Sequence, residues 1–216
     1  MKTTKLLSLI RFLLCFTLNL RAQSGTCGAN LTWELTDSTL TISGSGAMDN
    51  SRPWSSYSSQ IARVSLPEGL TNICDNAFYQ CSNLQSLVIP NTVTSIGYSA
   101  FDACTSLKQV TLGNAVETIG HSAFSSTSIT SITLPSSVTS IEDYAFGYCK
   151  KLTEITIPGS VSSIGNDAFQ SCEQLSKATI EEGVKSIGYS AFQNCYKMTD
   201  ISLPSSLISI GSSAFS

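Results

Sequence analysis

Cysteine is the residue type in this chain whose spacing most invites a chemical interpretation. The 216-residue sequence holds eight cysteines. Five of them form a regular series: Cys81, Cys104, Cys149, Cys172 and Cys195. Zinc ligands typically come in pairs about two to four residues apart, whereas members of this series are at least 23 residues apart. The spacing argues against a metal site and favours small apolar thiols in a core.

Disulfides would require neighbouring thiols of the series to approach one another. Stacked units would lie about 4.8 Å apart, which suits the Cα separation of a disulfide. Equivalent side chains would point the same way, so their Cβ atoms would stay outside the usual ~3.5–4.5 Å. Thr127 takes the sixth place and leaves an odd thiol. For Cys27 and Cys74, outside the series, two alternatives stay open: a bridge between them, or a free Cys74 thiol near the surface.

Histidine and carboxylate residues offer no catalytic arrangement. His121 is the single histidine, and a triad would need it held by a carboxylate and touching a nucleophile. The pairs Glu142-Asp143 and Glu181-Glu182 are sequence neighbours, whereas a glycosidase needs two carboxyl groups that converge across a cleft. We expect surface residues in all these places, and we predict no catalytic, cofactor or metal site.

A strict internal repeat carries these residues. The Ala-Phe pair occurs seven times, with successive Phe residues 23, 23, 22, 23, 23 and 23 positions apart. One unit cannot bury its own apolar side, so neighbouring units must stack. The repeated aromatic residues are therefore the predicted structural core: Phe78, Phe101, Phe124, Phe146, Phe169, Phe192 and Phe215.

Each unit contains a strand pattern, Leu-x-x-Val-x-Leu, filled in one unit by Leu107, Val110 and Leu112. This alternation is typical of a strand with one buried face. A β-branched segment such as 93–96 predicts a second short strand, and the Ala-Phe pair follows in a tight helical or 3-10 turn. The sequence thus predicts a β-rich solenoid with units of about 23 residues.

The phrase V-T-S-I-G-x-x-A-F-x-x-C-x-x-L at residues 93–107 resembles the BspA-type leucine-rich repeat, and the resemblance covers about residues 61–216. Residues 27–48 and the following Pro53-Trp54 resemble the opening β-hairpin of that family, which would cap the solenoid. The resemblance implies a secreted or cell-surface bacterial protein. It also implies roles such as adhesion to extracellular matrix or to other cells.

We divide the chain into a signal peptide (1–22), a capping hairpin with the first strand (23–65), and the leucine-rich repeats (66–216). The third part has six full units and a truncated seventh, which favours a fragment or a shortened gene. Lys2, Lys5, the apolar run 12–20 and the small Ala22 predict cleavable export. The run is shorter than the ~20 residues of a membrane span, so we expect no membrane insertion after cleavage.

Charge excludes nucleic acid as a partner. Four of the twelve basic residues lie within 1–22, so the mature chain keeps eight against fifteen acidic residues, a net charge of about −7. Binding to a phosphate backbone relies on clustered Lys and Arg. We found no such cluster in the sequence.

Two columns on the outward strand face are the candidate binding residues for a protein or glycoprotein ligand, such as host matrix or a cell surface. Thr is also simply a favourable exposed strand residue, so the hydroxyl column has a structural explanation too. Tyr98 and Tyr189, on the turn side, are further candidates. The alternative function is a docking or spacer module of a larger secreted protein or enzyme. The varied column is Ser86, Gln109, Ser131, Glu154, Lys177 and Asp200, and the hydroxyl column includes Thr111, Thr133, Thr156 and Thr179.

Overall fold

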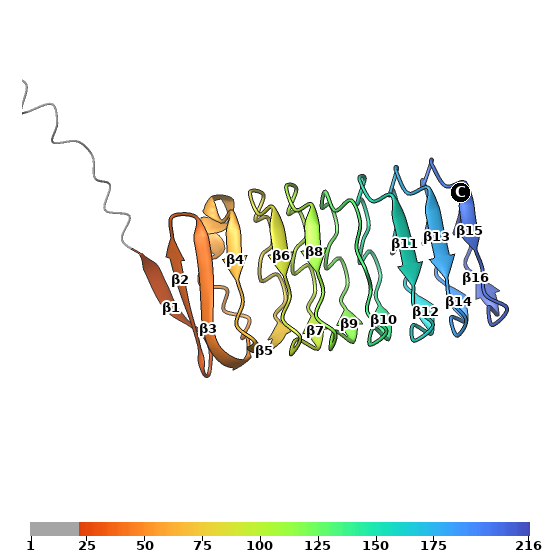
Figure 1. Cartoon of the computed structure of the whole chain (residues 1–216). Helices are drawn as coiled ribbons and strands as arrows, with labels where there is room; N and C mark the ends of the chain where they lie inside the picture. Colours follow the sequence, from red (N-terminus) through yellow and green to blue (C-terminus); the bar gives the residue numbers. More distant parts are fainter. Residues whose placement is uncertain (1–21) are drawn as a thin grey trace, which may run out of the picture.

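The computed structural model describes residues 22–216 as one elongated β-solenoid. Figure 1 shows the repeats side by side, from a three-stranded cap at one end to β15 and β16 at the other. The predicted fold class is confirmed. The predicted signal peptide lies outside the described residues, apart from Ala22.

The cap is an antiparallel meander of β1 (Gln23–Gly28), β2 (Leu31–Thr36) and β3 (Thr39–Ala47). Leu31, Trp33 and Leu35 alternate toward the core, and the residues between them are exposed. β3 then pairs in parallel with both β4 (Arg63–Ser65) and β5 (Gly69–Ile73). A 3-10 helix, η1 (Ser55–Gln60), precedes β4. The long strand β3 therefore joins the antiparallel cap to the parallel solenoid.

One long parallel ladder runs the length of the molecule without a break. Its two-residue strands come from the predicted β-branched segments, and each Ile pairs with the Ile of the next unit, as Ile96 does with Ile119. The predicted second strand of each unit is confirmed. After β5 the ladder consists of β7 (Ser95–Ile96), β9 (Thr118–Ile119), β10 (Ser140–Ile141), β12 (Ser163–Ile164), β14 (Ser186–Ile187) and β16 (Ser209–Ile210).

The Leu-x-x-Val-x-Leu segments form the second ladder, which we call the outer ladder. β6 (Ser86–Val88) pairs with β8 (Gln109–Thr111), and β11 (Glu154–Ile157) pairs with β13 (Lys177–Ile180), which pairs with β15 (Asp200–Ser202). Between β8 and β11 the expected strand at 129–134 is reduced to one isolated bridge, from Ser131 to Gln109. The prediction of a strand there was wrong.

The short unit explains this break. Phe124 and Phe146 are 22 residues apart, and alignment with the preceding unit places the missing residue between Thr127 and Ser128. That point lies after the turn and before the outer strand. Only the outer ladder is therefore disturbed, while β9 and β10 keep their register in the long ladder.

The core contains a continuous stack of the repeated phenylalanine rings, with centroids 5.1–5.5 Å apart and planes within 10° of parallel. Trp54 extends the stack into the cap, 5.9 Å from Phe78. Six of the seven predicted core rings are buried, but Phe215 is 42% exposed because its outer face lies at the end of the described stack.

Backbone hydrogen bonds join successive turns beside this stack. The Phe78 amide donates to the Ala100 carbonyl at 2.8 Å, and every later Phe–Ala pair repeats the bond. At the cap, the Trp54 indole Nε1 donates to the Ala77 carbonyl at 2.6 Å. The Trp54 side chain therefore supplies both the stacked ring and the hydrogen-bond donor that the Phe of a preceding repeat would supply.

The segment around each Ala-Phe pair differs from the prediction of a helical or 3-10 turn. Each consists of consecutive non-helical turns, and every segment but the last has two residues in the left-handed region, such as Ser99 (φ 46°) and Ala103 (φ 58°). These left-handed residues close the coil within a few residues, which a continuing helix would not do.

Candidate interaction surface

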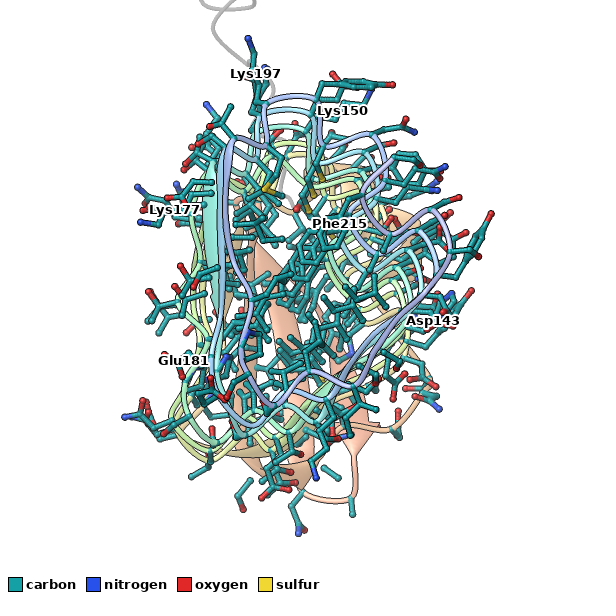
Figure 2. The ribbon with its side chains drawn as sticks, turned by 90° about the vertical axis from the view of Figure 1, so that its right-hand side faces the viewer. Asp143, Lys150, Lys177, Glu181, Lys197 and Phe215 are labelled. Carbon is teal, nitrogen blue, oxygen red and sulfur yellow. The ribbon has the colours of Figure 1, made fainter. Side chains whose placement is uncertain are left out.

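The outer ladder presents the two predicted columns on one face, which we call the outer-strand face. The varied column is exposed along its whole length, and the hydroxyl column is exposed except for the half-buried Thr179. Figure 2 looks along the solenoid and shows Lys177 and Glu181 on this side, away from Asp143. The structure therefore brings both predicted columns together on one surface, whereas the further candidates Tyr98 and Tyr189 are exposed in the turn segments instead.

Charge on this face gathers over β11, β13 and β15. Parallel register places Glu154 beside Lys177 and Lys177 beside Asp200. The Lys177 Nζ lies 3.5 Å from the Asp200 Oδ2, with both side chains more than half exposed. Such an exposed ion pair contributes little to stability, so its charged groups remain available for a partner.

Sequence reasoning missed two depressions on the outer-strand face, one on each side of segment 131–134. The first, of about 340 Å³, is lined by residues that include Thr111, Asn114 and Thr133. The second, of about 390 Å³, is lined by residues that include Glu154 and Glu181. The step of 22 residues was the signal that could have found them.

The backbone hydrogen bonding of the outer ladder is incomplete beside the two depressions. The Ile89 amide donates to the Thr111 carbonyl at 2.9 Å. The equivalent bond one unit later, from Leu112 to Thr133, does not occur among the backbone bonds of residues 22–216. Thr133 therefore lies in a segment whose ladder is incomplete.

The cysteines are core residues. All seven cysteines within residues 22–216 are free and buried. Cys104 Sγ donates to the Phe78 carbonyl at 3.1 Å, and Cys149 Sγ does the same to Phe124. Thr127, in the series' vacant place, donates its hydroxyl to the Phe124 carbonyl at 2.9 Å. Members of this column therefore satisfy carbonyls of the turns as well as filling space.

Thiol chemistry is suppressed by this burial. Desolvation raises the pKa of Cys81 and of Cys195 to about 12, and a thiol must ionise to act as a nucleophile. Cys27 and Cys74 are both free, and Cys74 is only 4% exposed. The bridge between them is not formed, and the expectation of a surface thiol at Cys74 was wrong.

His121 lies within an aromatic stack. Its ring is stacked on Tyr98, with centroids 5.3 Å apart, and contacts Tyr144 at 5.7 Å with the planes 59° apart. The His121 amide donates to the Glu142 Oε2 at 2.9 Å. The side chain is half-buried, so our expectation of a plain surface residue missed its two ring neighbours.

The carboxylate pairs tie neighbouring units together. Glu142 accepts from His121 in the preceding unit, whereas Asp143 accepts from the Asn166 amide of the next at 2.7 Å. Glu182 accepts from the Ser205 amide at 2.7 Å, and hydrogen bonds from Ser205 and Ser206 lower the pKa of its carboxyl. These residues are surface charges, as expected, but each also has a structural bond that sequence spacing alone did not reveal.

Over residues 22–216, no three His, Cys, Asp or Glu side chains gather as a metal site. Within the same range, no helix has the length and apolar character needed to cross a bilayer.

The chain is similar to solved leucine-rich repeat structures from bacteria. A Treponema pallidum leucine-rich repeat protein has 26% identity and a TM-score of 0.66, over 87% of this chain and 86% of that one. A leucine-rich cell surface protein from Faecalibacterium prausnitzii has 30% identity and a TM-score of 0.61, over 90% of this chain and 52% of that one. A Bacteroides ovatus leucine-rich repeat protein has 24% identity and a TM-score of 0.73, over 85% and 54%.

The chain thus spans about half the length of the Bacteroides and Faecalibacterium structures. No curated protein matches the sequence. The family model described as the BspA type leucine-rich repeat region, with six copies, matches residues 55–153 and 117–216. These two matches together take in most of the chain and all of the repeats after the cap, and the chain therefore belongs to the BspA-type leucine-rich repeat family.

Proposed function

We propose that this chain is an exported, cell-surface binding protein without catalytic activity, whose outer-strand face binds a protein or glycoprotein. The observation that carries the proposal is the alignment of both predicted columns on one exposed face of a rigid solenoid. Function in repeat proteins is concentrated on such extended surfaces. The description of the Faecalibacterium structure as a cell surface protein supports the location.

The contact residues that we favour lie around the break in the outer ladder. The two depressions flank Thr133, and the charged side chains of Glu154, Lys177 and Asp200 follow directly. Shape and mixed charge together would select a partner better than a uniform row of threonines. Adhesion to host matrix or to another cell is the role that we propose for this contact.

Binding of residues 23–216 to immobilised matrix proteins, mucin and host cells tests the proposal. Thr133→Lys places a charged chain between the depressions and should weaken binding at least about tenfold, which is ~1.4 kcal/mol. Ser162→Lys is the matched control, because Ser162 is exposed outside the outer-strand face and Lys185 occupies the same place one unit later. The proposal fails if nothing in the panel binds, or if both variants lose binding equally.

The second candidate function is a docking or spacer module within a larger secreted protein. The observation that favours it is that the chain spans about half of two of its structural relatives. The genomic sequence after Ser216 distinguishes the two. A catalytic domain there would support the module, whereas more repeats or a cell-wall anchor would count against it.

A further inference from the structure

A second surface lies on the opposite side of the solenoid from the outer-strand face. We call it the turn face, and Figure 2 shows Asp143 on it. It consists of the segments that carry the Ala-Phe pairs: 74–80, 97–103, 120–126, 142–148, 165–171, 188–194 and 211–216. These segments contain no Lys or Arg, but they contain five carboxylates: Asp75, Asp102, Glu142, Asp143 and Asp167.

Aromatic side chains occupy the middle of the turn face. Tyr98, His121 and Tyr144 follow one another in successive units as the aromatic stack described above. Tyr98 is 50% exposed, and Tyr148, in the same unit as Tyr144, is 42% exposed. The surface is therefore both aromatic and acidic over three neighbouring units.

The unit that carries Tyr144 is adapted to hold it. Tyr144 and Tyr148 have φ angles of 57° and 60°, and the left-handed region is unfavourable for a bulky residue. Gly147 follows the repeat Phe, where every other unit has a side chain, and a Cβ there would lie 3.2 Å from the Tyr144 ring. Core packing does not require these tyrosines, because the same places hold short polar residues such as Asn76 in other units.

Among residues 22–216, no lysine or arginine forms an ion pair with the carboxylates of the turn face. Asp167 is only 6% exposed and accepts a hydrogen bond from the neutral Gln170 amide at 2.9 Å. Burial raises the pKa of Asp102 and of Asp167. The two ion pairs among the described residues, Lys150–Glu173 and Lys177–Asp200, lie outside the turn face. A cation brought by a partner would compensate this charge.

We propose that the turn face binds a cationic, arginine-bearing segment of another protein, centred on Tyr98, His121 and Tyr144. A guanidinium group can stack on an aromatic ring and also donate to carboxylates, which a compact ammonium does less well. The acidic surroundings repel anionic partners such as sulfated glycans. This contact is separate from the outer-strand face, so the protein would hold two partners on opposite sides.

Binding of residues 23–216 to three synthetic 12-residue peptides tests the proposal by calorimetry. The peptides alternate serine with arginine, lysine or glutamate. We expect the arginine peptide to bind tightest, at least about tenfold tighter than the glutamate peptide, with affinity that falls as salt screens the charges. Equal binding of the arginine and lysine peptides would contradict a role for the rings.

A double variant, Tyr98→Ser with Tyr144→Asn, removes both tyrosine rings of the aromatic stack and introduces residue types that other units hold at these places, as at Ser212 and Asn76. We expect it to bind the arginine peptide about tenfold more weakly, with unchanged circular dichroism. Ser162→Ala, which lies outside both faces and changes no charge, is the control and should leave this affinity unchanged. The proposal is overturned if the arginine peptide binds no better than the glutamate peptide, or if the double variant binds as tightly as the parent.

Discussion

Individual side chains of the cap make the hydrogen bonds that a preceding repeat would make to the first unit. Trp54 Nε1 donates to Ala77 where later units use a Phe amide, and Asn50 Oδ1 accepts from the Asp75 amide as Asp75 does from Tyr98 one unit on. Unpaired backbone groups in a core are costly. The cap residues therefore match the first repeat bond by bond.

Trp54 can be tested against the other tryptophan of the cap. Trp54→Phe keeps a ring in the stack but leaves the Ala77 carbonyl without its donor, so we expect a loss of about 1–3 kcal/mol in the free energy of unfolding. Trp33→Phe is the control, because the Trp33 Nε1 is buried without a hydrogen-bond partner. Urea unfolding followed by circular dichroism measures both, and an equal loss in the two variants would contradict the role of the Trp54 bond.

The buried thiols predict a loss of stability in alkali. Burial raises the pKa of Cys74 and Cys81 from 9.0 to about 12 in the folded state. The folded state therefore holds these protons more tightly than the unfolded chain, and the stabilisation is complete below pH 9 and declines as pH rises from there toward 12. The free energy of unfolding, measured from pH 7 to 11, should fall above about pH 9.

Cys172→Thr introduces the residue type that the short unit holds at this place, Thr127. The variant has one titrating thiol fewer, so its free energy of unfolding should fall less steeply above pH 9. Ellman's reagent should also detect none of the seven thiols of residues 23–216 at neutral pH until the protein is denatured. Rapid labelling of the native protein would show that the thiols are accessible and would refute the explanation.

At the scale of strands, one missing residue decides the shape of the outer-strand face. The long ladder passes the short unit undisturbed, while the outer ladder is reduced to a single bridge at Ser131. A parallel ladder needs both neighbours in register, and a shortened connection before one strand removes that register locally. Two shallow depressions are the result.

Insertion of one serine between Thr127 and Ser128 should restore the outer ladder. We expect residues 131–134 to form a strand between β8 and β11, because the unit would regain the 23-residue period of its neighbours. Hydrogen exchange of the Leu112 amide, which lacks its bond to Thr133, should slow at least about tenfold, since bonded amides exchange only on opening.

The matched control inserts serine after Cys149, where the unit already has the full period. That insertion should disturb the pairing of β11 with β13 instead of extending it. If Leu112 exchanges at the same rate with and without the first insertion, the missing residue is not the cause of the break.

The limits of sequence reasoning also lie at this scale. The recurrent Phe predicted the stack, and the Leu-x-x-Val-x-Leu pattern and the β-branched segments predicted the two strands of a unit, because residues 23 apart must occupy equivalent places. The columns were aligned across the 22-residue step as if no residue were missing, so the loss of the strand at 129–134 was not predicted. The stack of Tyr98, His121 and Tyr144 was not predicted because Tyr144 belongs to a different column from Tyr98 and His121, so repeat spacing alone does not place its ring beside theirs.

Across the whole molecule, stability is arranged along one axis. Each unit contacts its two neighbours, so the free energy of unfolding is approximately a sum over units and interfaces. The cap covers one end of the core. At the other end, Ile208, Ile210 and Phe215 are 78%, 49% and 42% exposed.

In a polypeptide of residues 23–216, local unfolding should therefore begin in the unit that contains Phe215. The Gly211 amide donates to Ile187 at 2.8 Å, and the Gly165 amide makes the equivalent bond to Ile141 at 3.0 Å. We expect Gly211 to exchange at least about tenfold faster than Gly165, because an end unit opens with one interface lost and an internal unit with two. Equal exchange rates would contradict opening from this end.

The placement of Trp33 and Trp54 has a spectroscopic consequence. These are the chain's two tryptophans, and both belong to the cap, with rings 5.9 Å apart. Tryptophan fluorescence, excited at the red edge of the absorption band, therefore reports on the cap end alone. Far-ultraviolet circular dichroism averages over every unit. Divergence between the two optical melts would be a direct readout of how far cooperativity reaches along the axis.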